Sequence, residues 1–307
     1  MNRRRSADDA AVCLRRFFRS VSSASLGAAW LVLCAPASGA ARDIHATTPN
    51  APATEQAAIE EGRALARELL SLQPAETTLQ SGVLRIWESR KLRAVVPVRV
   101  SVLLTPTHWL TVYETVPTNA APQDLPLTNG PRADTPRSDA PCSNAPTVQE
   151  RLTVTHCANA PNRYELEAHH GQTAERRTLS GDELMRPFAD SDFWIADLGL
   201  EFLHWPDQKV LRREMRRGQW CVVLESRRPG PATDGYVRVV SWIDLDSGGI
   251  VQAEAFDPLD RKLKEFAPKS FKKVRGRWHL QEMEIRNLQT GSRTRLEFAL
   301  PIPTDAP

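Results

Sequence analysis

The sequence contains no apolar run of about twenty residues, which is the length that a membrane-spanning helix needs. It also lacks the short motifs of common catalytic sites: there is no G-x-S-x-G, no H-E-x-x-H and no phosphate-binding loop. None of its seven histidines forms a pair with metal-ligand spacing and a third ligand nearby. We therefore expect neither a permanent membrane span, nor a metal or other cofactor, nor an enzyme.

Charge of either sign is in little excess, because 40 Lys and Arg face 37 Asp and Glu in 307 residues. Six of the arginines and two of the aspartates lie in residues 1–40. There, a short apolar run at 26–37 (LGAAWLVLCAPA) precedes the small residues Ser38, Gly39 and Ala40, which is typical of a secretory signal peptide cleaved after Ala40. The remaining chain holds 34 basic and 35 acidic residues, once those of 1–40 are subtracted. This balance predicts no nucleic-acid partner, and the signal predicts a periplasmic location.

Cysteine is also scarce, with five residues in the chain. Three of them, Cys142, Cys157 and Cys221, follow the predicted signal peptide. An exported protein can form disulfides, so Cys142 and Cys157 are a candidate pair. Their bridge would close a short loop and contribute about 3 kcal/mol. Cys221 alternates within an apolar strand and is expected to be a core residue.

The chain after the signal changes its hydrophobic period once. Residues 41–53 are small and polar and predict a flexible lead. Thr54 can then cap a helix over 55–73, with Ile59, Ala64, Ala66, Leu69 and Leu70 as its packing face. From residue 82 to 116, and again from 151 to 300, apolar residues alternate with polar ones, which predicts antiparallel strands.

These strands predict a mainly β fold with helices (α+β), in a single domain of residues 54–300 followed by a tail at 301–307. We expect about ten or eleven antiparallel strands, and a sheet of that size must curl into an open sheet or a barrel. Its concave face must be filled by side chains, by helices or by a ligand.

Proline interrupts the strand pattern between residues 117 and 150. From Pro126 to Pro146 it recurs every five residues, as in PRADT, PRSDA and PCSNA. This slipped repeat predicts a disordered, Pro-rich insertion rather than a folded motif.

The segment SDFWIADLGLEFLHWPDQ at 191–208 is unusually apolar. As one helix ended by Pro206, it would align five residues in a stripe, and Phe193, Leu200 and Leu203 would fall on other faces. The stripe comprises Trp194, Ile195, Leu198, Phe202 and Trp205. A surface helix needs only one such stripe, so this segment requires a second apolar partner.

Three runs carry a family resemblance: DFWIADLGLEFLHWPDQKVLRREMRRGQWCVVLES (192–226), YVRVVSWIDLDSGGIVQAEAFDPLDRKLKEF (236–266) and KVRGRWHLQEMEIRNLQTGSRTRLEF (273–298). Together they resemble the bacterial outer membrane lipoprotein-sorting proteins over about residues 185–298. Residues 76–116 fit that family weakly. The resemblance implies a LolA-like fold, which is an unclosed antiparallel β-barrel with helices covering its mouth.

The better-known members of that family carry the acyl chains of lipoproteins or lipids between membranes in the barrel cavity. The resemblance therefore implies a periplasmic lipid carrier that works between an inner-membrane transporter and an outer-membrane acceptor. On this reading the lid is formed by Trp194, Leu198, Phe202 and Trp205, and the cavity wall by Trp87, Val98, Val100, Tyr113, Val222, Trp242 and Leu296. Alternation alone does not determine which strand face is concave.

Two other readings remain open at this point. The same open sheet could belong to a regulatory or scaffold module of the cell envelope that binds a protein partner. A related fold hosts small-molecule chemistry, although no convergent acid, base or nucleophile set is present in the sequence. Fold alone does not decide among these functions.

Overall fold

The computed structural model describes residues 54–117, 148–157, 160–170, 173–232, 234–274 and 277–300. The predicted signal peptide, lead and tail lie outside these residues, as does most of the predicted Pro-rich insertion. Strand β4 begins at Val148, so the last residues of the predicted insertion belong to the sheet. None of the described helices is long and apolar enough to cross a bilayer.

The described residues form one antiparallel sheet of 13 strands rather than ten or eleven. Its order is β6-β5-β4-β3-β2-β1-β13-β12-β11-β10-β9-β8-β7, so two meanders are joined where β1 pairs with β13. The first meander comprises β1 (Thr78–Glu88), β2 (Lys91–Leu104), β3 (His108–Thr115), β4 (Val148–Cys157), β5 (Ala160–His170) and β6 (Thr173–Leu179). The second comprises β7 (Asp207–Arg216), β8 (Gln219–Arg227), β9 (Arg238–Asp244), β10 (Ile250–Phe256), β11 (Lys262–Val274), β12 (Arg277–Asn287) and β13 (Arg293–Phe298).

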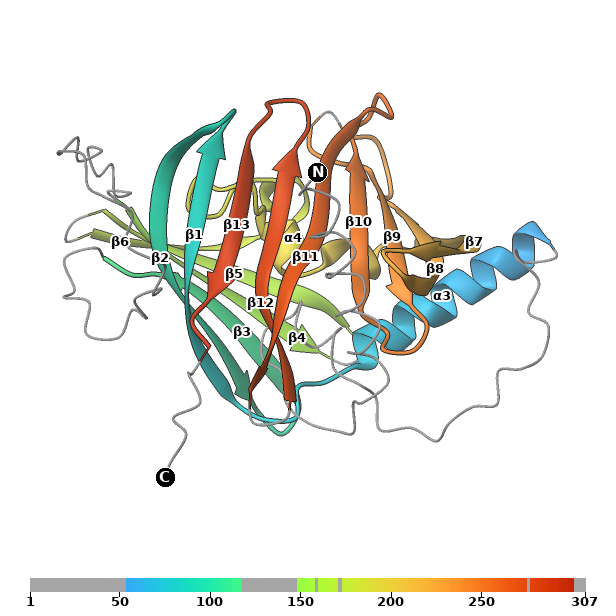
Figure 1. The fold of residues 1–307 in the computed structure, drawn as a ribbon, viewed down its shortest axis with the longest axis horizontal. Helices are drawn as coiled ribbons and strands as arrows, with labels where there is room; N and C mark the ends of the chain where they lie inside the picture. The colour runs from blue at the N-terminus through green and yellow to red at the C-terminus, as the bar shows by residue number, and fades with distance from the viewer. Residues whose placement is uncertain are drawn as a thin grey trace, which may run out of the picture.

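The sheet is unclosed, because β6 and β7 are its two ends. The sequence TAERRTL of β6 has no apolar alternation, and all its residues except Leu179 are exposed, so period-two analysis does not detect this strand. Figure 1 shows the sheet strongly curled, with β1 and β11–β13 in front and the green strands β3–β5 behind.

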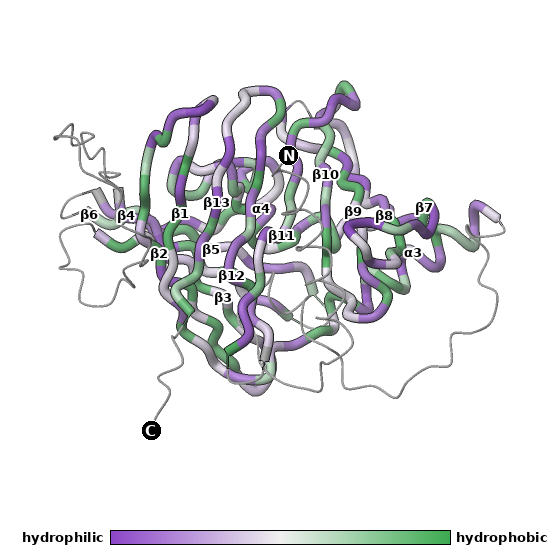
Figure 2. The backbone as a smooth tube through the Cα atoms, viewed as in Figure 1, coloured by the Kyte–Doolittle hydropathy of each residue, from purple (hydrophilic) through white to green (hydrophobic). Residues whose placement is uncertain are grey.

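The apolar core fills the concave side of this curl. Alternate residues of the strands, such as Val98, Val100 and Leu296, join one cluster with the segment that connects β6 to β7. Figure 2 shows hydrophobic and hydrophilic residues alternating along the strands, as a sheet with one buried face requires. A second, smaller cluster contains Cys221, Val223, Val240, Trp242 and Val251, the opposite face of β8–β10.

Helix α3 (Glu55–Ser71) covers the edge strand β7. Thr54 caps it as predicted, because its side chain accepts a hydrogen bond from the Ala57 amide. The buried face differs from the predicted one: it comprises Ala58, Gly62, Ala66 and Leu69, whereas Ala64 is exposed. A Cβ on Gly62 would lie 2.6 Å from the Lys209 backbone nitrogen, so small residues allow this close approach.

The connection between the two ends of the sheet, residues 180–206, is here called the plug. It contains η1 (Gly181–Leu184), α4 (Ile195–Leu198) and η2 (Glu201–His204). The predicted single helix over 191–205 was therefore wrong. Gly199 packs so closely on β5 that a Cβ would lie 2.2 Å from the Tyr164 hydroxyl oxygen, and Leu200 adopts a left-handed φ of 52°. The chain turns there instead of continuing the helix.

Candidate functional site

The plug occupies the concave side of the sheet. In Figure 1, α4 and the yellow turns around it lie behind β11–β13 and in front of β4 and β5. Phe193, Ile195 and Leu198 are at most 2% exposed, and Leu200, Phe202, Leu203 and Trp205 are also buried. Except for the half-buried Trp194, the apolar residues that a single helix would have placed on several faces are thus buried, because the curled sheet surrounds the plug.

A buried ion pair joins the plug to β11. Lys264 Nζ lies 2.9 Å from Asp197 Oδ2 and donates to the Asp192 carbonyl at 2.8 Å. It also lies 3.5 Å from the centroid of the Trp194 ring. Burial lowers the pKa of Lys264 to about 8, although the Asp197 carboxylate opposes that shift. The ammonium is therefore held by one carboxylate, one carbonyl and one aromatic face, all from the plug.

The Asp197 carboxylate has three partners: Lys264, Tyr236 and the backbone amide of Trp194. Its Oδ1 accepts a hydrogen bond from the Tyr236 hydroxyl at 2.9 Å, and its Oδ2 accepts one from the Trp194 amide at 2.8 Å. Burial raises the pKa of Tyr236 well above its ordinary value, and the Asp197 charge adds to this effect. Tyr236 therefore stays a hydrogen-bond donor to the plug at neutral pH.

Strands β3 and β5 hold the plug through a second group of hydrogen bonds. Tyr113 on β3 donates to the Leu198 carbonyl at 3.1 Å, and Asn162 on β5 donates to the Gly199 carbonyl at 2.8 Å. The Tyr164 hydroxyl donates to Glu201 at 2.8 Å. Burial raises the pKa of the Glu201 carboxyl and of Tyr164. Side chains of β3 and β5 thus donate hydrogen bonds to the carbonyl groups at the C-terminal end of α4.

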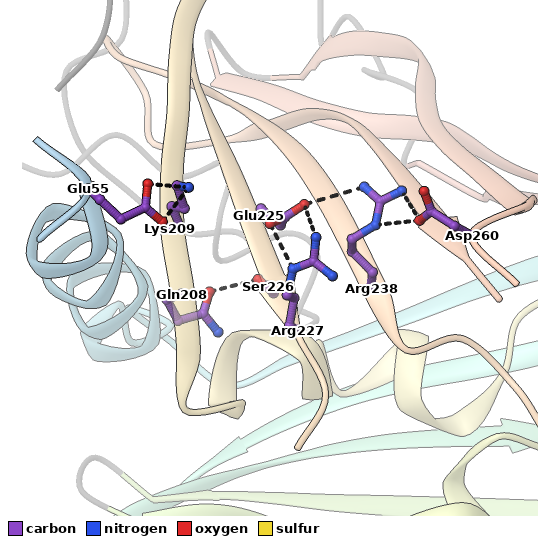
Figure 3. Close-up of polar contacts among 8 residues, drawn as sticks. All are labelled: Glu55, Gln208, Lys209, Glu225, Ser226, Arg227, Arg238 and Asp260. Atoms are coloured by element: carbon purple, nitrogen blue, oxygen red, sulfur yellow. Dashed lines mark hydrogen bonds and ion pairs between the residues drawn. The ribbon is translucent and has the colours of Figure 1, made fainter. Parts of the chain in front are cut away.

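Gln208, the second residue of β7, holds the end of the plug. Its amide nitrogen donates to the carbonyls of Phe202 and Trp205, each at 2.9 Å, and its oxygen accepts from Ser226 at 2.7 Å. Figure 3 shows Gln208 beside Lys209, whose ammonium bonds both oxygens of Glu55 on α3 at 2.6 and 2.7 Å. Two consecutive residues of β7 therefore fix the plug and the helix.

Figure 3 also shows a second group of ion pairs, on β8, β9 and the turn that follows β10. Arg227 Nε donates to Glu225 at 2.9 Å, and Arg238 bridges Glu225 and Asp260, its Nε lying 2.9 Å from Asp260. Arg227 and Asp260 are exposed, so the Arg227–Glu225 and Arg238–Asp260 pairs contribute about 0–1 kcal/mol each. The Arg238–Glu225 pair is largely buried, with side chains that are 12% and 11% exposed. They stabilise the surface of β8 and β9 and take no part in holding the plug.

A groove opens between α3, the end of the plug, the last residue of β4 and the first residues of β5. Its volume is about 780 Å³. The buried or half-buried apolar side chains Ala66, Leu70, Leu203 and Trp205 form its floor. The exposed residues Glu60, Arg63, Arg67, Cys157 and Pro206 border it. We call this the mouth groove.

Two histidines lie beside the mouth groove. His204 of η2 lines it, and its Nε2 is buried without a hydrogen-bond partner in the described part of the chain. His156 of β4 stacks on Trp109, with ring centroids 3.6 Å apart. Burial lowers the pKa of His204 to about 4. Burial also lowers the pKa of His156, to about 3, and the nearby His204 adds to that shift. Both rings are neutral at neutral pH.

The predicted wall and lid residues divide between two faces of the sheet. Trp87 and Trp242 do not lie on the concave face: Arg293 and Arg295 cover the Trp87 ring, and Trp242 belongs to the second cluster. The choice of face was therefore wrong for these two. Val222 is buried opposite Ile243, a member of the core cluster. The others lie in or against that cluster: Val98, Val100, Tyr113, Trp194, Leu198, Phe202, Trp205 and Leu296.

The predicted lid residues belong to the plug, and the predicted wall residues Val98, Val100, Tyr113 and Leu296 share its apolar cluster. Of the eleven wall and lid residues predicted, Trp205 lines the mouth groove. Sequence analysis missed Lys264, Asp197, Arg63 and Arg67. A lysine at 264 follows the strand alternation of KLKEF without any sign of burial, so no local signal identifies it. The spacing of Arg63 and Arg67 does place both on one helix face.

The cysteines lie apart. Cys157 is exposed and has no disulfide partner among the residues that the structure describes; its predicted partner Cys142 lies outside them, so the disulfide stays a prediction. Cys221 is buried, which raises the pKa of its thiol to about 12. Within the described ranges, no group of three His, Cys, Asp or Glu side chains could hold a metal ion.

Two solved structures are similar to the chain in fold. One is a DUF1329 family protein from Desulfovibrio piger, with a TM-score of 0.57 and 15% identity over 81% of this chain and 95% of the other. The second is an outer membrane lipoprotein-sorting protein domain from Vibrio parahaemolyticus, with a TM-score of 0.57 and 18% identity over the same shares. The chain has the fold of the outer membrane lipoprotein-sorting proteins. At these identities the likeness concerns the fold alone, and the unclosed, curled antiparallel sheet confirms the open barrel expected from the sequence.

A family model described as "Uncharacterized protein" matches residues 171–301. This range contains the plug and the whole second meander of the sheet. No curated protein matches the chain.

Proposed function

We propose that the protein is a periplasmic carrier that binds the acyl chains of lipoproteins or other lipids and moves them towards the outer membrane. The mouth groove is the observation that supports this proposal. Its volume of about 780 Å³ lies within the range of ligand sites, and its floor is apolar. An acyl chain on Ala66, Leu70 and Trp205 would gain about 0.8 kcal/mol for each buried methylene.

The plug determines how far a chain can enter. Because buried apolar side chains of the plug already fill the concave face, a ligand reaching that face must displace them. The plug is held there by hydrogen bonds whose net contribution is about 0.5–1.5 kcal/mol each. A carrier needs such a reversible arrangement, since the binding energy must be recovered on delivery. Donor and acceptor would be an inner-membrane transporter and an outer-membrane receptor.

The test is lipid binding by the full chain. Protein purified gently from its host should carry acyl species, detected by native mass spectrometry and by lipid extraction. Leu70→Ser should lower the affinity for a fluorescent fatty acid about five- to tenfold, because a half-buried leucine contributes roughly 1 kcal/mol of apolar contact. The control Leu259→Ser changes a leucine that is 71% exposed in the β10–β11 turn and should leave binding unchanged.

A protein with no co-purified lipid and no uptake of the fluorescent fatty acid would contradict the carrier. If that protein also retained a partner protein on an affinity column, the alternative function, a scaffold or regulatory module of the envelope, would replace it.

A further inference from the structure

The mouth groove carries positive charge that the protein itself does not fully neutralise. Arg63 and Arg67 are one turn apart on α3 and both border the groove. Arg63 Nε donates to the Pro206 carbonyl at 3.3 Å, and Arg67 Nε donates to the Arg63 carbonyl at 3.2 Å. Within the described ranges, no carboxylate pairs with either guanidinium, so their terminal nitrogens remain available to a ligand.

This arrangement differs from that of arginines elsewhere on the sheet. Arg85 pairs with Glu297, Arg295 with Glu284 and Arg238 with Asp260. Glu60 also borders the mouth groove, and its carboxylate, which accepts a hydrogen bond from Gln56 at 2.9 Å, offsets one of the two arginine charges, so these three side chains carry a formal net charge of +1. His204 adds no charge at neutral pH, because burial lowers its pKa to about 4.

We propose that the mouth groove binds an amphiphile with an anionic head group, a carboxylate or a phosphate, through Arg63 and Arg67. The inference rests on the proposed function, because the chain of the amphiphile lies on the same apolar floor. Guanidinium groups bind both kinds of oxyanion in bidentate geometry. The anchor of Arg63 on the Pro206 carbonyl places its guanidinium beside the end of the plug, near Trp205. The head group then stays at the rim, and the chain points along the floor.

The test compares ligands that share one acyl chain. The full chain, freed of lipid, is titrated with palmitate, palmitoyl lysophosphatidate and monopalmitoylglycerol by calorimetry. The two anionic ligands should bind about tenfold more tightly than the neutral one, as charge-assisted hydrogen bonds allow. That advantage should shrink as the salt concentration rises, because the arginines are exposed. Palmitate and lysophosphatidate together distinguish carboxylate from phosphate recognition.

The variant Arg63→Gln/Arg67→Gln should bind all three ligands equally, with unchanged affinity for the neutral one. The control Arg90→Gln/Arg151→Gln removes two exposed arginines outside the groove and should keep the preference. Equal binding of charged and neutral ligands by the unaltered protein would overturn the inference and leave the carrier intact. A preference that survives the first variant would also overturn it. Binding of none of the three ligands would overturn both proposals.

Discussion

Lys264 on β11 and Asp197 on the plug form an ion pair of 2.9 Å in which both side chains are nearly inaccessible, at 3% and 11% exposure. The two residues are 67 positions apart in the sequence. Their pairing is one of the contacts that keep the plug inside the curled sheet.

Removing the lysine should destabilise the protein strongly. Lys264→Met leaves the Asp197 carboxylate buried without its cation, which typically costs about 3–5 kcal/mol of unfolding free energy. Urea denaturation measures this loss. The control Arg85→Met breaks the partly exposed pair with Glu297 and should cost about 0–1 kcal/mol. Adding Asp197→Asn to Lys264→Met should recover part of the loss. Equal losses in the two single variants would show that burial of the Lys264 pair is unimportant.

Acid should destabilise the protein through His156 and His204. Their pKa values in the folded state are about 3 and about 4, below the ordinary 6.5. As the pH falls, these histidines are protonated in the unfolded chain at a higher pH than in the folded protein. The free energy of unfolding that they contribute is therefore fully present above pH 6.5. It is lost as the pH falls towards 4 and then 3. Each pH unit inside this window costs about 1.4 kcal/mol per histidine.

Urea midpoints at several pH values between 7 and about 4.5 measure this effect. The variant His156→Gln/His204→Gln should show a flatter pH dependence. Its comparison with the unaltered protein cancels Glu201, whose raised pKa acts in the opposite direction. Parallel curves for the two proteins would contradict the assignment.

Gly199 should not tolerate a side chain. A Cβ there would meet the Tyr164 ring and hydroxyl at 2.2–2.6 Å, so Gly199→Ala must shift the plug away from β5. We expect a loss of about 1–3 kcal/mol of stability, as for other overpacked cores. In a Tyr164→Leu background the same substitution should cost clearly less, because the clashing atoms are gone. A double-mutant cycle by urea denaturation checks this, and additive effects would contradict the close contact.

A substitution at Gly62 tests how closely α3 packs on β7. In a free helix, Gly→Ala stabilises by about 1 kcal/mol. Here the new Cβ would lie 2.6 Å from the Lys209 backbone nitrogen, and backbone cannot yield as a flexible side chain can. Gly62→Ala should therefore destabilise the protein in thermal unfolding. The exposed control Ala64→Gly should show the ordinary helix effect, a loss of about 1 kcal/mol. A stabilised Gly62→Ala would mean that α3 does not pack this closely.

Several local features are readable in the chain itself. The period-two runs predict the strands, Thr54 and the following residues predict the start of α3, and the three family-like runs predict the open barrel. These signals are local because a strand or a helix end depends on neighbours a few positions away. The apolar excess at 191–208 also indicates correctly that this segment needs more than one apolar partner.

Contacts between distant residues decided the rest. The alternation of side chains along a strand predicts that Ile86 and Trp87 lie on opposite faces of the sheet. Only the curl of the sheet shows that Ile86 lies on the concave face and Trp87 on the convex face. The helical stripe of the plug is broken because Tyr164, on another strand, occupies the space beside Gly199. Burial of Lys264 likewise follows from the plug that covers it. The sequence by itself determined the strands that alternate, though not β6, which has no alternation. The tertiary structure decided their inner face and the path of the plug, because both depend on packing between segments far apart in the chain.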